Sequence, residues 1–221
     1  MIKTIINQTN IMDLFFSQIC GICGKLNNEG LCHKCRITLE RLSENTICNP
    51  DLENMYFHEL IYIFKYEGLI RKLILDYKFH EKSYMYVCFV NFILNNKKIF
   101  EKIQSYDTII PVPISKKRMK ERGYNQSLLI AKNISRKVKI PLQVNCLWKT
   151  RNIVEQSKLN KEQRKENIQN VYELKNEEIL NNKRILLIDD IYTTGSTVNE
   201  CCKILQGAMP KKIDVLVLAK D

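Results

Sequence analysis

The chain has 221 residues, a formal net charge of +11 and 45% hydrophobic residues, which suits one α/β domain with a small additional segment. No apolar run reaches the roughly 18 residues that a membrane-spanning helix needs, and nine cysteines without a secretory signal argue against a disulfide framework, so we expect a cytoplasmic protein. The positive charge is typical of proteins that bind nucleic acids or acidic membranes, although a Lys-, Asn- and Ile-rich composition from an A/T-biased coding sequence would also produce it.

Two Cys-x2-Cys pairs stand near the start of the chain. They consist of Cys20, Cys23, Cys32 and Cys35. Each pair can form one knuckle of a tetrahedral site, and four thiolates close the shell, so a zinc ion held there would be structural. His33 is a less favoured substitute ligand, and free thiols or a redox pair are the alternatives. We predict a zinc ribbon within residues 1–50 and a main domain over residues 51–221.

A short helix and two longer, more apolar helices are predicted in the first half of the chain. Residues 36–60 read as a linker with a short helix around Thr38–Ser43. An apolar stripe at helical spacing follows over residues 69–77, and a second helix, apolar on most sides, is predicted over Ser83–Asn95. We expect both helices to pack in the core.

A strongly basic segment follows a predicted buried strand, Asp107–Val112. Its cations are Lys116, Lys117, Arg118, Lys120 and Arg122. Ligands of open parallel sheets bind beyond the carboxyl ends of the strands, so a loop at this position can meet a pyrophosphate or a nucleic-acid backbone. A solvated charged loop is the alternative.

The next part of the chain alternates between helix and strand patterns. After Gly123 the sequence predicts a helix over Gln126–Lys137 and strands over Leu142–Trp148 and Val171–Leu174. The polar residues 151–170 between these strands are interpreted as a mobile flap or a helix that covers the site.

The last part of the chain is the predicted functional centre. The apolar run Ile185–Ile188 suits a strand buried on both faces of a parallel sheet, and Asp189 and Asp190 follow at its carboxyl end. A helical pattern from Val198 and another apolar run, Ile213–Ala219, complete a βαβ unit.

A hydroxyl-rich turn connects the two acids to this helix. It consists of Thr193, Thr194, Gly195, Ser196 and Thr197. The N–H groups of a helix N-terminus, together with these hydroxyls, can bind a phosphate, and the missing Gly-Lys-Ser/Thr distinguishes the turn from a Walker A loop. The acids must then bind something else, either the cis-diol of a sugar or a magnesium ion. A plain turn residue followed by a helix cap is the less favoured alternative.

The stretch from residue 184 to residue 197 resembles the motif with which type I phosphoribosyltransferases bind phosphoribosyl diphosphate (PRPP). By that resemblance, Asp189 and Asp190 would hold the ribose hydroxyls and the turn over residues 193–197 would hold the 5-phosphate. The resemblance also implies that magnesium accompanies PRPP.

Several motifs in a fixed order extend this resemblance over most of the chain. They are the two cysteine pairs, Tyr66-Glu67-Gly68, Tyr77-Lys78-Phe79, Val112-Pro113, Arg122-Gly123-Tyr124-Asn125-Gln126, Arg151 with Gln156 and Leu159, Arg164 with Asn167, and the acidic motif. Their order resembles the ComF family. The resemblance implies a type I phosphoribosyltransferase fold, a parallel sheet flanked by helices, with an N-terminal zinc ribbon.

Members of that family are linked to natural transformation, the uptake of single-stranded DNA across the inner membrane. We therefore expect a PRPP-binding protein that acts in DNA uptake, with single-stranded DNA and other uptake proteins as partners and a peripheral position at the inner membrane. The alternatives are a metabolic phosphoribosyltransferase and a DNA-binding module whose nucleotide site is vestigial. The sequence leaves turnover and the acceptor substrate open.

Overall fold

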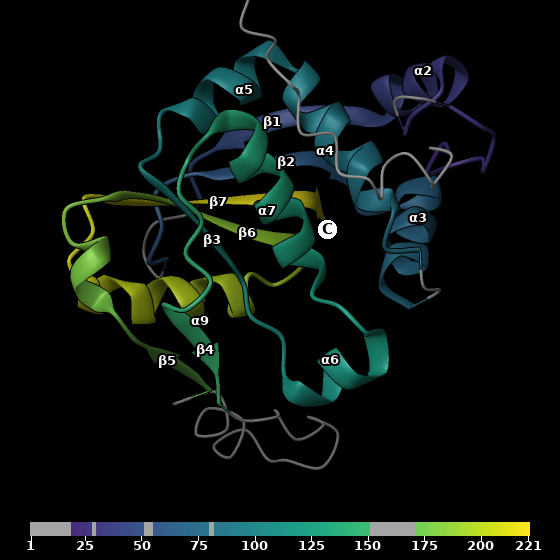
Figure 1. The fold of residues 1–221 in the computed structure, drawn as a ribbon. Helices are drawn as coiled ribbons and strands as arrows, with labels where there is room; N and C mark the ends of the chain where they lie inside the picture. Colours follow the sequence, from purple (N-terminus) through teal and green to yellow (C-terminus); the bar gives the residue numbers. More distant parts are fainter. Residues whose placement is uncertain (1–18, 28–29, 51–54, 80–81, 151–170) are drawn as a thin grey trace, which may run out of the picture.

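The computed structural model describes residues 19–27, 30–50, 55–79, 82–150 and 171–221. A five-stranded sheet in the order β1-β2-β7-β6-β3 forms its centre (Figure 1). In that order the strands are Ser43–Cys48, Leu60–Lys65, Lys212–Lys220, Arg184–Tyr192 and Thr108–Pro111. The four strands β2, β7, β6 and β3 are parallel, and β1 pairs with β2 antiparallel at one edge.

The central strand β6 is buried on both faces, as its apolar sequence requires. The side chains of Leu186 and Ile188 belong to one core, and those of Ile185 and Leu187 belong to the other. All four are completely buried. Because successive side chains of a strand point to opposite faces, an unbroken apolar run needs a layer of structure on each side.

Helices cover one face of the sheet, and a helix with a small hairpin covers the other. On the first face lie α3 (Gly68–Phe79), α4 (Met85–Asn95), α5 (Lys97–Gln104) and α7 (Gln126–Val138). The second face is covered by α9 (Ser196–Leu205) and by the hairpin β4 (Leu147–Lys149) and β5 (Tyr172–Leu174). Figure 1 shows α4 and α7 on one side of the sheet and α9 on the other. This is the sheet-and-helix architecture of the type I phosphoribosyltransferase fold.

The remaining elements are short. They are α2 (His33–Leu42), α6 (Lys116–Arg122) and two 3-10 turns, Glu177–Leu180 and Gln206–Ala208. Across the part of the chain that the structure describes, no helix has the length and apolarity needed to cross a membrane.

Several parts of the sequence prediction differ from the structure. The predicted linker 36–60 contains most of α2 and the strand β1, whose polar sequence is only partly buried at the sheet edge. The helix α5 was not predicted, because only Ile99 and Ile103 of its eight residues are buried. The strand predicted over Leu142–Trp148 is reduced to β4, with a single β-bridge between Leu142 and Ile109.

The predicted basic loop is the helix α6. The Oγ atom of Ser115 accepts a hydrogen bond from the backbone N–H of Arg118 at 3.2 Å, which caps the first turn. Gly123 ends the helix with a left-handed backbone, φ 75°. The helices predicted over residues 69–77, Ser83–Asn95 and Gln126–Lys137 are confirmed as α3, α4 and α7.

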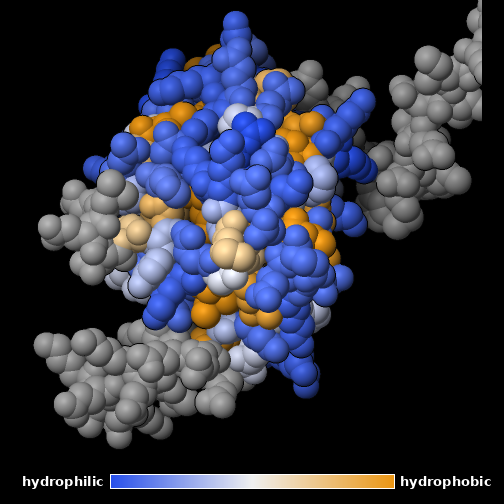
Figure 2. Space-filling model, turned by 90° about the vertical axis from the view of Figure 1, so that its left-hand side faces the viewer, coloured by the Kyte–Doolittle hydropathy of each residue, from blue (hydrophilic) through white to orange (hydrophobic). Residues whose placement is uncertain are grey.

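The amino edge of the sheet carries a compact ion cluster. The carboxylate of Asp214 is completely buried and accepts a hydrogen bond from Tyr106 Oη at 2.6 Å. Lys212 contacts Asp214 at 3.0 Å and Glu59 at 2.8 Å, and Lys102 pairs with both acids. Figure 2 views the molecule from this side, where the surface is mostly hydrophilic and its hydrophobic side chains lie in separate patches. These groups satisfy one another, and the candidate site lies at the opposite edge.

Candidate functional site

A cavity of about 320 Å³ lies at the carboxyl edge of the sheet. Its charged lining residues are the cations Lys78, Arg118, Arg122 and Lys149 and the acids Asp189 and Asp190. These residues come from α3, α6, β4 and β6, which meet where β3 and β6 end. The position agrees with the rule that open parallel sheets bind ligands beyond the carboxyl ends of their strands.

The two predicted acids both line this cavity, but their environments differ. Oδ1 of Asp189 accepts hydrogen bonds from Ser127 Oγ at 2.8 Å and from the backbone N–H of Asp190 at 2.9 Å. Burial raises the pKa of Asp189 to about 6, and the neighbouring charge of Asp190 contributes, while Lys78 and the hydrogen bonds oppose the rise. Asp189 is therefore close to a protonation change near neutral pH.

Asp190 forms an ion pair with Lys78, a residue that the sequence did not single out as a ligand. The Lys78 Nζ atom lies 2.9 Å from Asp190 Oδ2, and both side chains are nearly buried. Lys78 occupies the last turn of α3, more than 100 residues before Asp190 in the sequence. This separation explains why no local pattern predicted the pair.

The Tyr77-Lys78-Phe79 and Arg122–Gln126 motifs contact each other in the structure. Tyr124 donates a hydrogen bond from its hydroxyl to the backbone carbonyl of Tyr77, and Tyr77 Oη donates to the carbonyl of Gln126 at 2.9 Å. The tyrosine rings pack with their centroids 5.8 Å apart. These contacts fix the end of α3, and with it the backbone of Lys78, against the start of α7.

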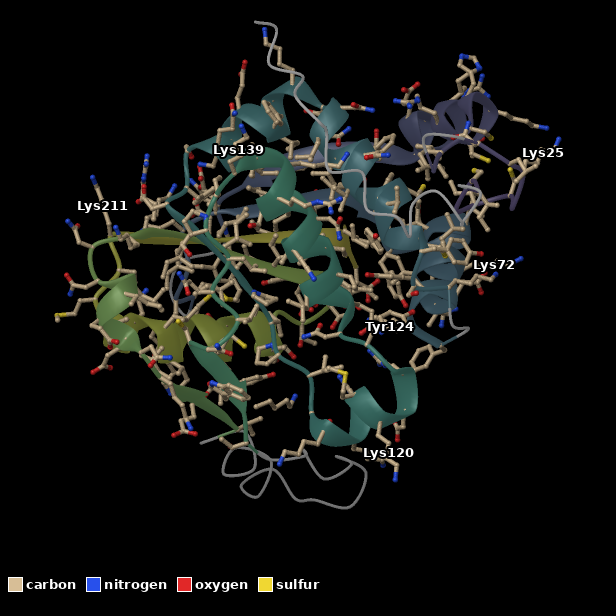
Figure 3. All side chains as sticks on the ribbon, in the orientation of Figure 1. Lys25, Lys72, Lys120, Tyr124, Lys139 and Lys211 are labelled. Carbon is tan, nitrogen blue, oxygen red and sulfur yellow. The ribbon has the colours of Figure 1, made fainter. Side chains whose placement is uncertain are left out.

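The five predicted cations of residues 116–122 divide between two faces of α6. Arg118 and Arg122, four residues apart and hence on one face, line the cavity. Lys116, Lys117 and Lys120 are exposed and are not among its lining residues. Figure 3 shows Lys120 pointing outward from α6, away from the sheet.

Arg122 is held by two further contacts. Its Nη1 atom donates a hydrogen bond to Gln126 Oε1 at 3.0 Å, and its guanidinium lies 4.7 Å from the centre of the Phe79 ring. Burial lowers the pKa of Arg122, and the charge of Arg118 lowers it further, whereas Asp190 opposes the shift. Arg122 is therefore a pre-positioned cation beside the acids.

The hydroxyl-rich turn follows β6, and α9 begins at Ser196. Of the five predicted phosphate-binding residues, Thr193 and Thr197 line the cavity. Gly195 has φ 74°, and a Cβ atom at this position would collide with the hydroxyl of Tyr192. Oγ1 of Thr194 and Oγ of Ser196 hydrogen-bond to each other at 2.8 Å. The left-handed backbone and the close approach of Tyr192 therefore require glycine at position 195.

Lys149 and Tyr172, from the hairpin β4–β5, complete the cavity wall, and the sequence did not identify either. Lys149 Nζ lies 3.2 Å from Tyr172 Oη. Burial lowers the pKa of Lys149, and the nearby Arg118 lowers it further. These two residues flank the predicted flap at 151–170, which lies outside the described residues.

The four predicted zinc ligands gather at one point. Their sulfur atoms all lie within 4.8 Å of one another, and they are Cys20, Cys23, Cys32 and Cys35. Four thiolates are the donor set of a structural zinc site. His33 is exposed and does not belong to the cluster.

The cysteine cluster rests directly on the main domain. A Cβ atom on Gly21 would lie 3.0 Å from Cys88 Cβ, and one on Gly30 would lie 2.7 Å from Val87 Cγ1, so this segment packs tightly against α4. Leu31 and Leu39 belong to the same core as the inner side of α4. A metal bound by the cysteines would therefore stabilise part of the main core as well as the segment itself.

Comparisons with known proteins agree with this architecture. A family model described as "Phosphoribosyl transferase domain" matches residues 125–221. The chain is 28% identical to Competence protein F of Haemophilus influenzae, covering 93% of this chain and 98% of that protein. It is 25% identical to Competence protein ComFC of Bacillus subtilis, covering 85% and 71% of the two chains. These relatives, together with the matched domain, support the ComF family for this chain.

Two further proteins are similar to the chain. The DNA utilization protein YhgH of Escherichia coli K12 is 26% identical, with 85% of this chain and 83% of that protein covered. Among solved structures, orotate phosphoribosyltransferase from Aeropyrum pernix aligns with a TM-score of 0.37 and 12% identity over 84% of this chain and 80% of that chain.

Three of the motifs that carry the ComF resemblance lie together around the cavity. Ser127, the residue directly after the Arg122–Gln126 motif, bonds to Asp189 of the acidic motif, and the Tyr77–Phe79 motif brings Lys78 to Asp190. Lys78 stands in the Tyr77-Lys78-Phe79 motif, and this motif was the sequence signal that could have identified it. No such motif contains Lys149 or Tyr172.

Proposed function

We propose that this ComF-family chain binds PRPP in the cavity at the carboxyl edge and acts in natural transformation, in handling single-stranded DNA on the cytoplasmic side of the inner membrane. One observation carries the proposal: the acid pair, the hydroxyl-rich turn and four cations line or border the same cavity. Each group suits a different part of PRPP, namely its diol, its 5-phosphate and its diphosphate.

The proposed contacts follow from the chemistry of each group. Asp189 and Asp190 accept hydrogen bonds from the ribose hydroxyls, because a carboxylate offers several acceptor sites. The start of α9 binds the 5-phosphate through its N–H groups and the threonine hydroxyls. Arg118 and Arg122 contact the diphosphate, for which a planar guanidinium can supply two parallel donors. Magnesium bound with PRPP would take oxygen ligands from the diphosphate and the acids.

The role in DNA handling rests on two supports. The curated relatives are named for competence and for DNA utilization. The outer face of α6 exposes Lys116, Lys117 and Lys120, which are not needed inside the cavity. We propose that these lysines contact the phosphates of single-stranded DNA without reading its sequence.

A phosphoribosyl transfer reaction to an unknown acceptor is the second candidate. The cations around the cavity favour it, because they would stabilise the negative charge that develops on a departing diphosphate. Release of diphosphate from PRPP in the presence of a nucleophilic acceptor is the measurement that distinguishes turnover from binding alone.

Calorimetric titration of the purified chain tests the main proposal. PRPP with magnesium, and a mixed-sequence single-stranded oligonucleotide, are titrated separately and together. We expect PRPP to bind more tightly than inorganic phosphate, and the oligonucleotide to bind with a strong salt dependence. DNA binding without any PRPP binding would instead favour a DNA-binding module with a vestigial nucleotide site. Loss of both would contradict the proposal.

A further inference from the structure

The proposed function uses the acid pair but assigns no contact to Lys78, the cation that pairs with Asp190. Lys78 Nζ lies 2.9 Å from Asp190 Oδ2, with 15% of the lysine side chain and 10% of the aspartate side chain exposed. Lys78 also reaches Asp189 electrostatically, since its charge opposes the upward shift in the pKa of that carboxyl. The ammonium group of Lys78 thus interacts with both acids that we assign to the ribose.

The position of Lys78 is set by its neighbours in the sequence. The residue before it, Tyr77, is completely buried and bonded to the Tyr124–Gln126 segment through both its hydroxyl and its carbonyl. The residue after it, Phe79, packs under the guanidinium of Arg122. Both sequence neighbours of Lys78 therefore contact the segment that also carries Arg122.

The ion pair with Asp190 occupies one side of an ammonium group that has three N–H donors. The side chain of Lys78 also lines the cavity, together with Arg118 and Arg122. A ribose whose 2- and 3-hydroxyls bind the acids carries its C1 substituent next to the 2-hydroxyl. A cation bonded to one of those acids is then within reach of a group on C1.

We propose that Lys78 is a specificity-determining residue, whose ammonium group bridges Asp190 and the 1-diphosphate of PRPP. The site would thereby prefer a sugar phosphate with a diphosphate on C1 over ribose 5-phosphate, which has only a hydroxyl there. This inference rests on the proposed PRPP site. It differs from a purely structural role for Lys78, in which the lysine neutralises a buried acid and touches no ligand.

The test compares PRPP with ribose 5-phosphate, by calorimetry at one magnesium concentration, for the wild-type chain and for Lys78→Met. A hydrogen bond to a charged group contributes enough that its loss lowers affinity by about tenfold or more. We expect the affinity for PRPP to fall by at least that factor relative to the change for ribose 5-phosphate. Lys78→Arg keeps the charge and should restore most of the preference.

The matched control is Lys72→Met, which removes the same charge from the same helix. Lys72 is exposed, lies outside the cavity lining, and points away from α3 into solvent (Figure 3). We expect it to leave both affinities within about twofold, the range of ordinary surface substitutions. Thermal melts identify any variant that fails to fold. Lys78→Gln, whose amide can still donate to Asp190, then takes the place of Lys78→Met in the same comparison.

Two results would overturn the inference, and they are distinguishable. If wild type binds PRPP but the variants lower the affinity for PRPP and for ribose 5-phosphate by the same factor, Lys78 has a structural role only. If wild type binds neither compound, the proposed function fails and the inference fails with it.

Discussion

Ser127 donates a hydrogen bond from its Oγ atom to Asp189 Oδ1 at 2.8 Å, and so connects the first turn of α7 to the end of β6. Asn125 caps the same helix and donates from its side-chain amide to the carbonyl of Val112 at 3.0 Å. The carboxyl ends of β3 and β6 are thereby joined through one helix N-terminus. The orientation of Asp189 depends on this arrangement.

The affinity for PRPP should depend on pH through Asp189. Its folded-state pKa is raised to about 6, so the carboxylate that accepts ribose hydroxyls is lost as pH falls through this value. About one molecule in ten would keep the charge one pH unit below it, which predicts a roughly tenfold weaker affinity at pH 5 than at neutral pH. Calorimetry from pH 5 to 8 checks this.

Two variants separate this effect from titration of the ligand itself. Asp189→Asn should lose the protein-dependent part of the transition. Ser127→Ala removes a hydrogen bond that lowers the pKa of Asp189, so the transition should move to higher pH. An unchanged midpoint in both variants would show that the phosphates of PRPP, and not Asp189, determine the pH dependence.

The cysteine cluster should hold one zinc ion per chain. The sulfur atoms of its four members lie within 4.8 Å of one another, which is compatible with a tetrahedral thiolate shell. Protein purified without added metal should contain zinc by elemental analysis. Cys35→Ser should lose that zinc and lower the melting temperature, because Cys35 lies in the core that includes α4.

Cys48→Ser is the control for the zinc prediction. Cys48 is a half-buried free thiol outside the cluster, so this variant should keep its zinc. Zinc-free protein with disulfide bonds among the four clustered cysteines would refute the prediction.

The acidic motif and the cysteine pairs could be predicted because each is continuous or closely spaced in the sequence. The apolar run before Asp189 predicts its strand, and the Cys-x2-Cys spacing brings the sulfur atoms together locally. Lys78 and Lys149 reach the same cavity from α3 and β4. Lys78 and Lys149 come together only because α3 and the hairpin pack on the sheet, and no local sequence pattern predicts this packing.

The basic segment shows a different kind of error. Ser115 and Gly123 are an N-cap residue and a C-terminal stop, and they were readable signals for the helix between them. The density of charge suggested a loop instead. Once the segment is helical, its cations can no longer share one role, because Arg118 and Arg122 face the cavity and Lys120 points outward.

Neutralising the outer face of α6 should weaken DNA binding and leave PRPP binding unchanged. The triple variant that combines Lys116→Gln, Lys117→Gln and Lys120→Gln loses up to three phosphate contacts. The slope of log affinity against log salt for single-stranded DNA should then decrease in magnitude by about 2, because each lost contact contributes roughly 0.7. Anisotropy titrations at several salt concentrations measure this slope.

A second triple variant controls for net charge. Lys97, Lys98 and Lys211 are exposed and lie outside the cavity lining, on α5 and at the amino edge of the sheet. Figure 3 shows Lys211 on the opposite side of the molecule from Lys120. Their replacement by Gln removes the same charge. If both triple variants change the slope equally, DNA binding responds to overall charge and α6 has no special part in it.

The two acids should differ in their effect on stability although both lower PRPP affinity. The loss of one hydrogen bond between a carboxylate and a ligand hydroxyl costs about 1.5–3 kcal/mol of binding free energy. Asp189→Ala and Asp190→Ala should therefore each weaken PRPP binding by tenfold or more. Asp190→Ala also leaves the nearly buried Lys78 ammonium without its ion-pair partner. It should therefore lower the melting temperature more than Asp189→Ala, which leaves two neutral donors, the Ser127 hydroxyl and the backbone N–H of Asp190, to find other acceptors.

Asp107→Ala is the matched control for the acid variants. Asp107 pairs with Arg184 at 2.8 Å, at the amino ends of β3 and β6. Its replacement therefore removes an ion-paired carboxylate at the end of the sheet opposite the cavity. We expect it to change stability but not PRPP affinity. The double variant Asp189→Ala, Asp190→Ala should show no PRPP binding by calorimetry. If it binds PRPP as tightly as wild type does, the acids do not hold the ribose and the proposed site is wrong.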